Sequence, residues 1–264
     1  MKQTLRSIKH AVMGTYLQAS QVYYTVAGKT VECNICQYKS NHLASDGWHQ
    51  HVICPYCKST VRHRLLMAAF SLLNEFGFDK LIENKSVLHF APEKHLEKVM
   101  RSKAGSYKTA DFLAEGYAYS RIDYNIDISA MKAIGDESFD CVIACDVLEH
   151  VPDHMGAIRE VYRVLKPGGY CVFTVPQKDN LKQTIEDLSI TSPQERERIF
   201  GQRDHLRIYG DDFVDMLTAC GFAVTGIDEH FFSKEIIDQY VLFPPILSKH
   251  PLATNYRKVF FGKK

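Results

Sequence analysis

From residue 86 onwards, short apolar runs alternate with segments in which apolar residues recur every three or four positions. Short apolar runs are typical of buried strands and the longer spacing of helices that bury one face. Strands are expected, in chain order, at 86–91, 107–111, just before Asp127, 139–145, 170–175, 222–227 and 256–262. Helices are expected at about 92–103, from Pro152 to Leu165, and at 213–220. This alternation predicts an α/β fold with a mostly parallel seven-stranded sheet and helices on both faces.

The first 77 residues show a different pattern. Six apolar residues share one face of an expected helix: Leu5, Ile8, Val12, Tyr16, Ala19 and Tyr23. We favour packing of this helix against its own domain, and peripheral contact with a membrane surface or a partner is the alternative, since basic residues stand at its start. A second helical pattern follows the basic triplet at 62–64 and ends near Gly77. The chain is therefore expected to form two units, 1–77 and 78–264.

Composition and charge narrow the functional classes. The 264 residues are 45% hydrophobic and 24% charged, which is typical of soluble globular proteins and not of disordered or fibrous ones. The longest apolar runs fall short of the roughly 20 residues that span a bilayer, and no secretory signal is evident, so a cytoplasmic location is expected. The net charge of +1 hides an asymmetry, because residues 1–70 carry eight lysines and arginines against two acids and the remainder is net negative.

Two Cys-x-x-Cys pairs are the strongest local pattern in the basic N-terminal unit. The pairs Cys33/Cys36 and Cys54/Cys57 are separated by 17 residues, a spacing typical of four-cysteine zinc sites. Four thiolates complete a tetrahedron and leave no position for water, so the predicted zinc ribbon is structural. Two unrelated reduced pairs or a redox motif are the alternatives, and three intervening histidines could replace one sulfur: His42, His49 and His51.

Polar residues follow several of the expected strands. Open parallel sheets bind ligands at the carboxyl ends of their strands, where these residues would gather. Asp111 lies 21 residues after Phe90, close to the roughly 20-residue offset at which an acid binds ribose hydroxyls in Rossmann-like units. A nucleoside ligand is therefore indicated, with a helix-capping or surface role of Asp111 as the alternative.

The segments 139–153 and 160–169 resemble class I S-adenosylmethionine-dependent methyltransferases of type 11. The resemblance rests on Phe139-Asp140, on Leu148-Glu149-His150 and on Leu165-Lys166-Pro167-Gly168-Gly169. It covers residues 86–228 well and 229–264 weakly, and it implies a Rossmann-like fold that binds S-adenosyl-L-methionine. The combination of a Cys-x-x-Cys ribbon, an Arg-His-Arg segment and an Ala-Pro-Glu first motif is similar to a bacterial set of such enzymes.

The resemblance also implies a cofactor site. Asp111 would bind the ribose, Asp127 with Ile128 would face the adenine, and 146–148 would line the methionine side. The implied cofactor-binding residues are Phe90, Ala91, Pro92, Glu93, Asp111, Phe112, Asp127, Ile128, Asp146, Val147 and Leu148. The first motif departs from the family, because His89 replaces the usual acid and none of the usual glycines is present. We expect the turn to be displaced rather than affinity to be lost, with Glu93 available to the cofactor ammonium.

Two histidines are candidate general bases for a hydroxyl or amine acceptor, His150 and His205. His150 belongs to the widespread Leu-Glu-His pattern and could instead support the sheet. The polar segment 177–203 has the length of an acceptor-binding insertion. The expected function is methyl transfer to a small molecule, sugar or glycolipid-type acceptor. The alternatives are an RNA or protein methyltransferase that docks through the basic ribbon, and a non-catalytic binding protein. The sequence makes no prediction of the oligomeric state.

Overall fold

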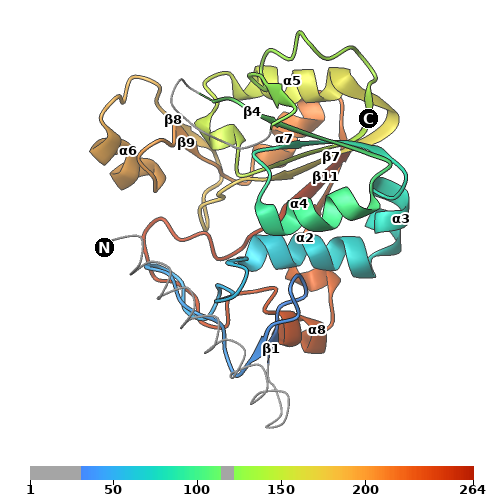
Figure 1. Cartoon of the computed structure of the whole chain (residues 1–264). Helices are drawn as coiled ribbons and strands as arrows, with labels where there is room; N and C mark the ends of the chain where they lie inside the picture. The colour runs from blue at the N-terminus through green and yellow to red at the C-terminus, as the bar shows by residue number, and fades with distance from the viewer. Residues whose placement is uncertain (1–30, 114–121) are drawn as a thin grey trace, which may run out of the picture.

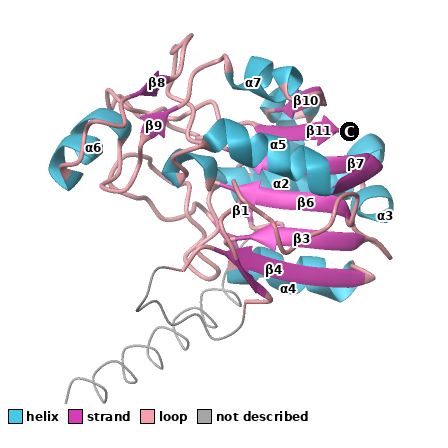
Figure 2. Cartoon of the chain, turned by 90° about the horizontal axis from the view of Figure 1, so that it is seen from above, coloured by secondary structure: helices cyan, strands magenta, loops and turns pink. Residues whose placement is uncertain are grey.

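A computed structural model describes residues 31–113 and 122–264 of the chain. Its centre is a seven-stranded sheet in the order β10-β11-β7-β6-β3-β4-β5 (Figures 1 and 2). The strands are β3 (Ser86–Phe90), β4 (Ser106–Asp111), β5 (Tyr124–Asn125), β6 (Phe139–Cys145), β7 (Leu165–Thr174), β10 (Ala223–Ile227) and β11 (Val259–Lys263). All pairs from β5 to β7 are parallel, and β11 runs antiparallel to both of its neighbours. The predicted seven-stranded, mostly parallel α/β sheet is confirmed.

Helices cover both faces of this sheet, as predicted. The helices α5 (His154–Val164) and α7 (Phe213–Ala219) pack on one face. The other face is covered by α2 (Val61–Leu72), α3 (Phe78–Leu81) and α4 (Lys94–Lys103), with α8 (Lys234–Tyr240) beyond them (Figure 1). The described residues also contain three short 3-10 helices: η1 (Asn74–Phe76), η2 (Leu148–His150) and η3 (Glu229–Phe231).

Element ends differ from the expected ones for local reasons. Asp153 caps α5, because its carboxylate accepts a hydrogen bond from the Gly156 amide at 2.7 Å, so the helix begins after Pro152. Pro92 lies in the extended turn before α4, which begins at Lys94. The strand β7 begins at Leu165, five residues earlier than expected, and includes the Lys-Pro-Gly-Gly segment that we expected to follow the helix as a stop.

The four-cysteine segment forms a small lobe below α2. Its hairpin consists of β1 (Val31–Glu32) and β2 (Lys39–Ser40), and in Figure 1 it lies beside α8 at the bottom of the molecule. The side chains of α2 belong to the same apolar cluster as those of β3, β6 and β11. The helix that follows the ribbon thus shares its core with the sheet, while the division into 1–77 and 78–264 stays a prediction.

The polar segment before His205 forms a second peripheral lobe. It contains β8 (Ile185–Glu186) and α6 (Pro193–Phe200), and β8 pairs with β9 (Arg207–Ile208). The helix expected at 5–23 lies outside the described residues. Within 31–113 and 122–264, no helix has the length and apolar character needed to cross a membrane.

Candidate functional site

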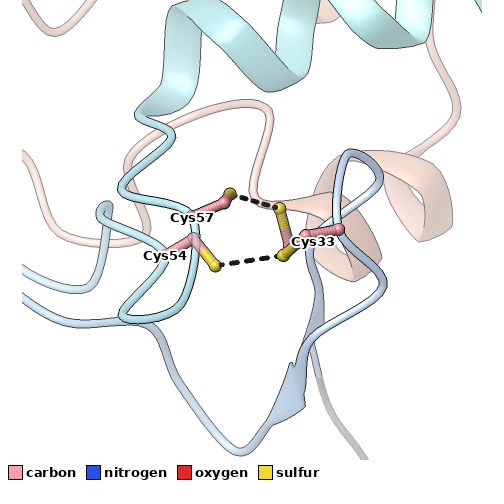
Figure 3. A group of neighbouring side chains, drawn as sticks. Cys33, Cys54 and Cys57 are labelled. Atoms are coloured by element: carbon pink, nitrogen blue, oxygen red, sulfur yellow. Dashed lines mark hydrogen bonds between the residues drawn. The ribbon is translucent and has the colours of Figure 1, made fainter. Parts of the chain in front are cut away.

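The four cysteines of the two Cys-x-x-Cys pairs converge on one point. Their sulfur atoms all lie within 4.8 Å of one another. Each sulfur of one Cys-x-x-Cys pair contacts a sulfur of the other pair: Cys33 Sγ lies 3.7 Å from Cys57 Sγ, and Cys36 Sγ lies 3.6 Å from Cys54 Sγ (Figure 3). The cluster predicted from the spacing is therefore present, and its donor set fits a tetrahedral zinc ion.

Both halves of this cluster have the same backbone geometry. In each, the amide of the residue four positions after the first cysteine donates to that cysteine's carbonyl oxygen, from Gln37 to Cys33 at 2.7 Å and from Lys58 to Cys54 at 2.9 Å. Gln37 and Lys58 both have a left-handed backbone, with φ of 63° and 65°. Two equivalent turns of this kind hold four sulfurs at one point without a disulfide, and the eight cysteines are all free.

Arg64 joins the cysteine lobe to the C-terminal part of the chain. Its side chain is fully buried, and its guanidinium donates to the carbonyl oxygens of Ser59, Val52, Tyr240 and Val241 at 2.8 to 3.1 Å. The Asn34 side chain donates in turn to the Arg64 carbonyl oxygen at 2.8 Å. The position of the cysteine lobe is thus fixed by a buried cation with carbonyl partners.

The carboxyl ends of β3 and β6 lie side by side, because the two strands pair directly in the sheet. The chain turns sharply after each strand, and the turning residues, Ala91 and Asp146, have positive φ values of 44° and 51°. A residue with a Cβ rarely adopts this backbone conformation, for which glycine is the usual choice. The first motif without glycine therefore adopts a left-handed backbone at Ala91, while the expected displacement of this turn relative to the family stays a prediction.

Glu93 follows this turn and is held by the basic triplet that opens α2. Its Oε1 accepts hydrogen bonds from Arg62 Nη2 at 2.8 Å and from His63 Nε2 at 3.0 Å. Its Oε2 is buried without a hydrogen-bond partner, 3.8 Å from His89 Nε2. Burial opposes ionisation of Glu93, but the Arg62 charge and the His63 hydrogen bond outweigh it and lower the pKa of this carboxyl.

Asp146, at the end of β6, is held by two arginines that come from distant parts of the chain. Arg62 Nε donates to Asp146 Oδ2 at 2.9 Å, and Arg257 Nη2 donates to Oδ1 at 2.5 Å. The Thr174 hydroxyl on β7 donates to the same Oδ1 at 2.8 Å. Burial raises the pKa of Asp146, but Arg257 and Arg62 outweigh this and leave it at about 2. Asp146 is therefore ionised at neutral pH.

The other predicted cofactor residues lie along the same edge of the sheet. Asp111 ends β4 and its Oδ1 accepts the Phe112 amide at 2.8 Å, while the Phe112 ring is 68% exposed. Asp127 accepts two hydrogen bonds from Ser129, whose amide and hydroxyl lie at 2.8 and 2.7 Å from its Oδ1.

Three predicted residues have side chains packed in the core, so only their backbone faces this edge: Phe90, Ile128 and Leu148. Their roles toward a cofactor stay predictions, as do those of Pro92 and Val147.

The two candidate bases meet beyond the end of β6. The rings of His150 and His205 lie edge to face with centroids 4.8 Å apart. His205 is 3% exposed, and its Nδ1 lies 3.1 Å from the Phe200 carbonyl oxygen, which can only accept a hydrogen. Nδ1 therefore carries the hydrogen and Nε2 keeps a free lone pair, for which the structure holds no hydrogen-bond partner. Burial and the nearby His150 lower the pKa of His205 to about 4, so the ring is neutral at pH 7.

Glu149 lies behind these histidines in the interior. It is 1% exposed, and its Oε1 lies 4.0 Å from His205 Nε2. Burial and the Asp146 charge raise the pKa of Glu149 well above its ordinary value. The turn that carries Glu149 is fixed by buried Arg207, which donates to the carbonyl oxygens of Leu148 and Val151 at 2.6 Å each and pairs with Glu186. The lobe at 177–203 is thereby tied to the Leu-Glu-His turn.

A cavity of about 340 Å³ lies between these groups. Its wall combines Asp146 and Arg257 with His205 and with the end of the inserted lobe at 200–202. The cysteine lobe contributes residues 46–49 to the same wall, among them Trp48, which stacks on His250 with ring centroids 3.9 Å apart. The expected acceptor-binding segment and a loop of the cysteine lobe thus line one cavity beside the carboxyl end of β6. His150 does not line this cavity.

The sequence analysis did not identify Arg62, Arg257 or Trp48 as site residues. A signal for Arg62 was present, because cations are unfavourable in the first turn of a helix and are rarely buried unless paired. Three consecutive basic residues at the start of a buried helix indicate that carboxylates lie opposite. The sequence contains no comparable signal for Arg257 or Trp48, whose partners lie far away along the chain.

Comparison with known proteins agrees with this geometry. Residues 102–173 match the sequence model of a family described as a methyltransferase domain. This segment is therefore similar to a methyltransferase domain. The chain is also similar to a solved S-adenosylmethionine-dependent methyltransferase of Mesorhizobium loti, at 14% identity and a TM-score of 0.51, over 79% of this chain and all of that one. At this identity, the likeness shows the Rossmann-like methyltransferase fold.

Curated relatives match part of the chain. A ubiquinone biosynthesis O-methyltransferase of Psychrobacter cryohalolentis is 26% identical over half of this chain and 47% of its own length. An arsenite methyltransferase of Aquipseudomonas alcaligenes is 27% identical over 42% of this chain and 31% of its own. The chain spans about half the length, or less, of these relatives. The names of these two relatives give different acceptors, so the comparisons indicate no single acceptor class.

Proposed function

We propose that the chain transfers a methyl group from S-adenosyl-L-methionine to a hydroxyl or amine of a small molecule, sugar or glycolipid-type acceptor. The observation that carries this proposal is the position of Asp146. It ends β6 at the edge where a nucleoside cofactor binds in this fold, and it also lines the cavity that contains His205. A cofactor on one side of Asp146 and an acceptor on the other would meet there.

Each residue has a distinct part in this proposal. Asp111 binds the ribose hydroxyls, Asp127 with Ile128 faces the adenine, and Glu93 takes the ammonium of the methionine part. When bound, the cofactor supplies a methyl group on a sulfonium, whose leaving group is already activated. The protein then aligns the acceptor and excludes water from the cavity. His205 is the base that we propose for the acceptor proton, and the Phe200 carbonyl fixes the tautomer that leaves Nε2 without a hydrogen.

The ribbon cysteines hold a structural zinc ion in the same proposal. Four sulfurs within 4.8 Å of one another would repel one another as free thiolates, and a divalent cation removes that repulsion. The ion would keep residues 46–49 of the cysteine lobe in place at the cavity wall. The ribbon therefore contributes to acceptor binding through its loop.

The charge distribution favours a small acceptor over a nucleic acid. Four of the eight basic residues of the first 70 belong to the described part of the chain: Lys39, Lys58, Arg62 and Arg64. Lys39 pairs with Glu32 at 3.6 Å, Arg62 pairs with two carboxylates, and Arg64 is fully buried. Lys58 is therefore the one exposed cation of these four without an ion pair to a described residue. A surface that binds phosphates needs exposed, uncompensated cations. RNA or protein methylation, and binding without catalysis, remain the outcomes that experiment must exclude.

Calorimetric titration with S-adenosylhomocysteine tests the proposal. We expect binding to the zinc-loaded protein, and a loss of about tenfold or more in the Asp111→Ala variant, because two hydroxyl hydrogen bonds disappear. Asp238→Ala, a surface carboxylate on α8, is the matched control and should bind as the wild type does. Absence of binding to the wild-type protein would overturn the enzyme function.

The acceptor class is tested by following formation of S-adenosylhomocysteine with three probes: catechol, phosphoethanolamine and a short RNA duplex. Turnover with either small molecule would support the proposed class. Turnover with RNA alone, at a rate that falls steeply with salt, would support the macromolecular alternative instead.

A further inference from the structure

Among the described residues, several buried polar atoms near the end of β3 lack partners, and two of them, on Arg62 and Glu93, have opposite character. Arg62 Nη1 is a buried donor without an acceptor, and Glu93 Oε2 is a buried acceptor without a donor. Leaving such groups unpaired is costly, especially when they are charged. The two atoms belong to residues that form a salt bridge with each other, since Arg62 Nη2 lies 2.8 Å from Glu93 Oε1. A ligand with an anionic acceptor and a cationic donor a few bonds apart would satisfy both atoms with charged partners.

The amino-acid end of S-adenosylmethionine has this composition, with a carboxylate and an ammonium on one carbon. The charges around the site also suit it. Arg62 and Arg257 are balanced by Glu93 and Asp146, so the cluster is neutral and is not filled by a simple cation or anion. A zwitterion adds no net charge and can satisfy both unpaired atoms. This argument rests on the proposed function, in which Glu93 takes the ammonium.

We infer that Arg62 binds the carboxylate of the cofactor's methionine part through Nη1, so that the helix after the zinc ribbon completes the cofactor site. Arg62 is held in place for this task, because its Nε and Nη2 are fixed on Asp146 and Glu93. The guanidinium thus connects the ends of β3 and β6. The N–H groups of Nη1 remain for the ligand.

Comparison of two ligands tests this inference. S-adenosylhomocysteine carries the amino-acid end, whereas 5'-methylthioadenosine has the same nucleoside and a thioether but lacks that end. We expect Arg62→Met to reduce the preference for S-adenosylhomocysteine over 5'-methylthioadenosine by about 10- to 100-fold in calorimetric titrations, the effect of one charge-assisted hydrogen bond. The affinity for 5'-methylthioadenosine should change little, and this binding also reports that the variant is folded.

Two further variants make the test specific. Arg159→Met removes an exposed arginine of α5, outside the proposed site, and should leave the preference between the two ligands unchanged. Arg62→Lys keeps the charge without the guanidinium fork, so it should lose part of the preference. An unchanged preference in Arg62→Met, or an equal loss in Arg159→Met, would overturn the inference while the proposed function stands. If the wild-type protein binds neither ligand, both are overturned.

Discussion

The buried guanidinium of Arg64 donates a hydrogen bond to the Tyr240 carbonyl oxygen at 2.8 Å, across 176 positions of sequence. This contact attaches the cysteine lobe to α8, and the same side chain also serves three other carbonyl groups. The lobe is thus positioned by backbone acceptors from both ends of the chain. These carbonyl oxygens belong to the backbone and keep their positions when Arg64 is replaced. A side chain without a guanidinium would therefore leave them without their donor.

We predict that Arg64→Met destabilises the protein by about 3 kcal/mol or more, since four buried carbonyl oxygens lose a charged donor. Urea unfolding of the zinc-loaded protein measures the change. Lys58→Met, at an exposed position six residues earlier, should shift the unfolding free energy by less than about 0.5 kcal/mol. Similar midpoints for the two variants would contradict the anchoring role of Arg64.

The cysteine cluster should bind one zinc ion per chain. Replacing Cys33 and Cys54 with serine removes one ligand from each half, and elemental analysis should then find less than about a tenth of an equivalent. Cys220→Ser, which changes a half-buried cysteine outside the cluster, should retain the metal. Unchanged metal content and thermal stability in the double variant would show that the cluster is not a zinc site.

Ala91 has a backbone conformation that suits glycine, with φ of 44°. The left-handed region costs a residue with a Cβ about 1 kcal/mol, while glycine loses more chain entropy on folding. We therefore expect Ala91→Gly to leave the unfolding free energy unchanged or to raise it by up to about 1 kcal/mol. The matched change Ala110→Gly, in the buried interior of β4, should lower it by about 1 kcal/mol or more. A clear loss of stability in Ala91→Gly would contradict this account.

Buried neutral histidines should make the fold sensitive to mild acid. Burial lowers the pKa of His89 to about 4, and the facing charges of Glu93, Glu97 and Arg62 together do not restore it. The unfolded chain takes up a proton near pH 6.5 and the folded chain does not, so stability is complete above pH 6.5 and falls as the pH decreases toward 4.

The measurement is urea unfolding of the zinc-loaded protein at pH 7.5 and pH 5. His89→Gln should show a smaller loss between these two values than the wild type, by about 2 kcal/mol. The variant gives up the 2.7 Å contact with the Tyr107 hydroxyl at both pH values, so this loss cancels in the difference. Equal pH dependence in the two proteins would show that His89 takes up its proton in the folded state.

His205 and His150 should differ in their effect on turnover. His205 lines the cavity with a fixed tautomer, whereas His150 makes its contact with the exposed Asp204, at 3.3 Å. With an acceptor that turns over, we expect His205→Gln to reduce kcat by about 100-fold or more and His150→Gln by less than about tenfold. Above pH 5 the wild-type kcat should show no acid limb from His205, because its pKa is about 4. A larger loss of kcat in His150→Gln than in His205→Gln would assign the general base to His150 instead.

The sequence predicted what depends on local periodicity and spacing. Strand and helix patterns identified the seven strands, and the Cys-x-x-Cys spacing identified the four-sulfur cluster, since each needs information from neighbouring residues only. Asp146 was identified because it follows a buried strand. Its partners Arg62 and Arg257 were not, because a salt bridge between residues 111 positions apart, such as Arg257 and Asp146, leaves no mark on local sequence. The backbone at Ala91 was also missed, since alanine carries no preference that reveals a positive φ.

Trp48 is the sole tryptophan of the chain, and it stacks on His250 in the wall of the cavity. Indole emission from this protein therefore originates at a single point, where the cysteine lobe meets the space proposed for the acceptor. The brightness of that emission therefore reports the contact between the indole and the His250 ring. An unlabelled sample already contains an optical probe of whatever enters this cavity.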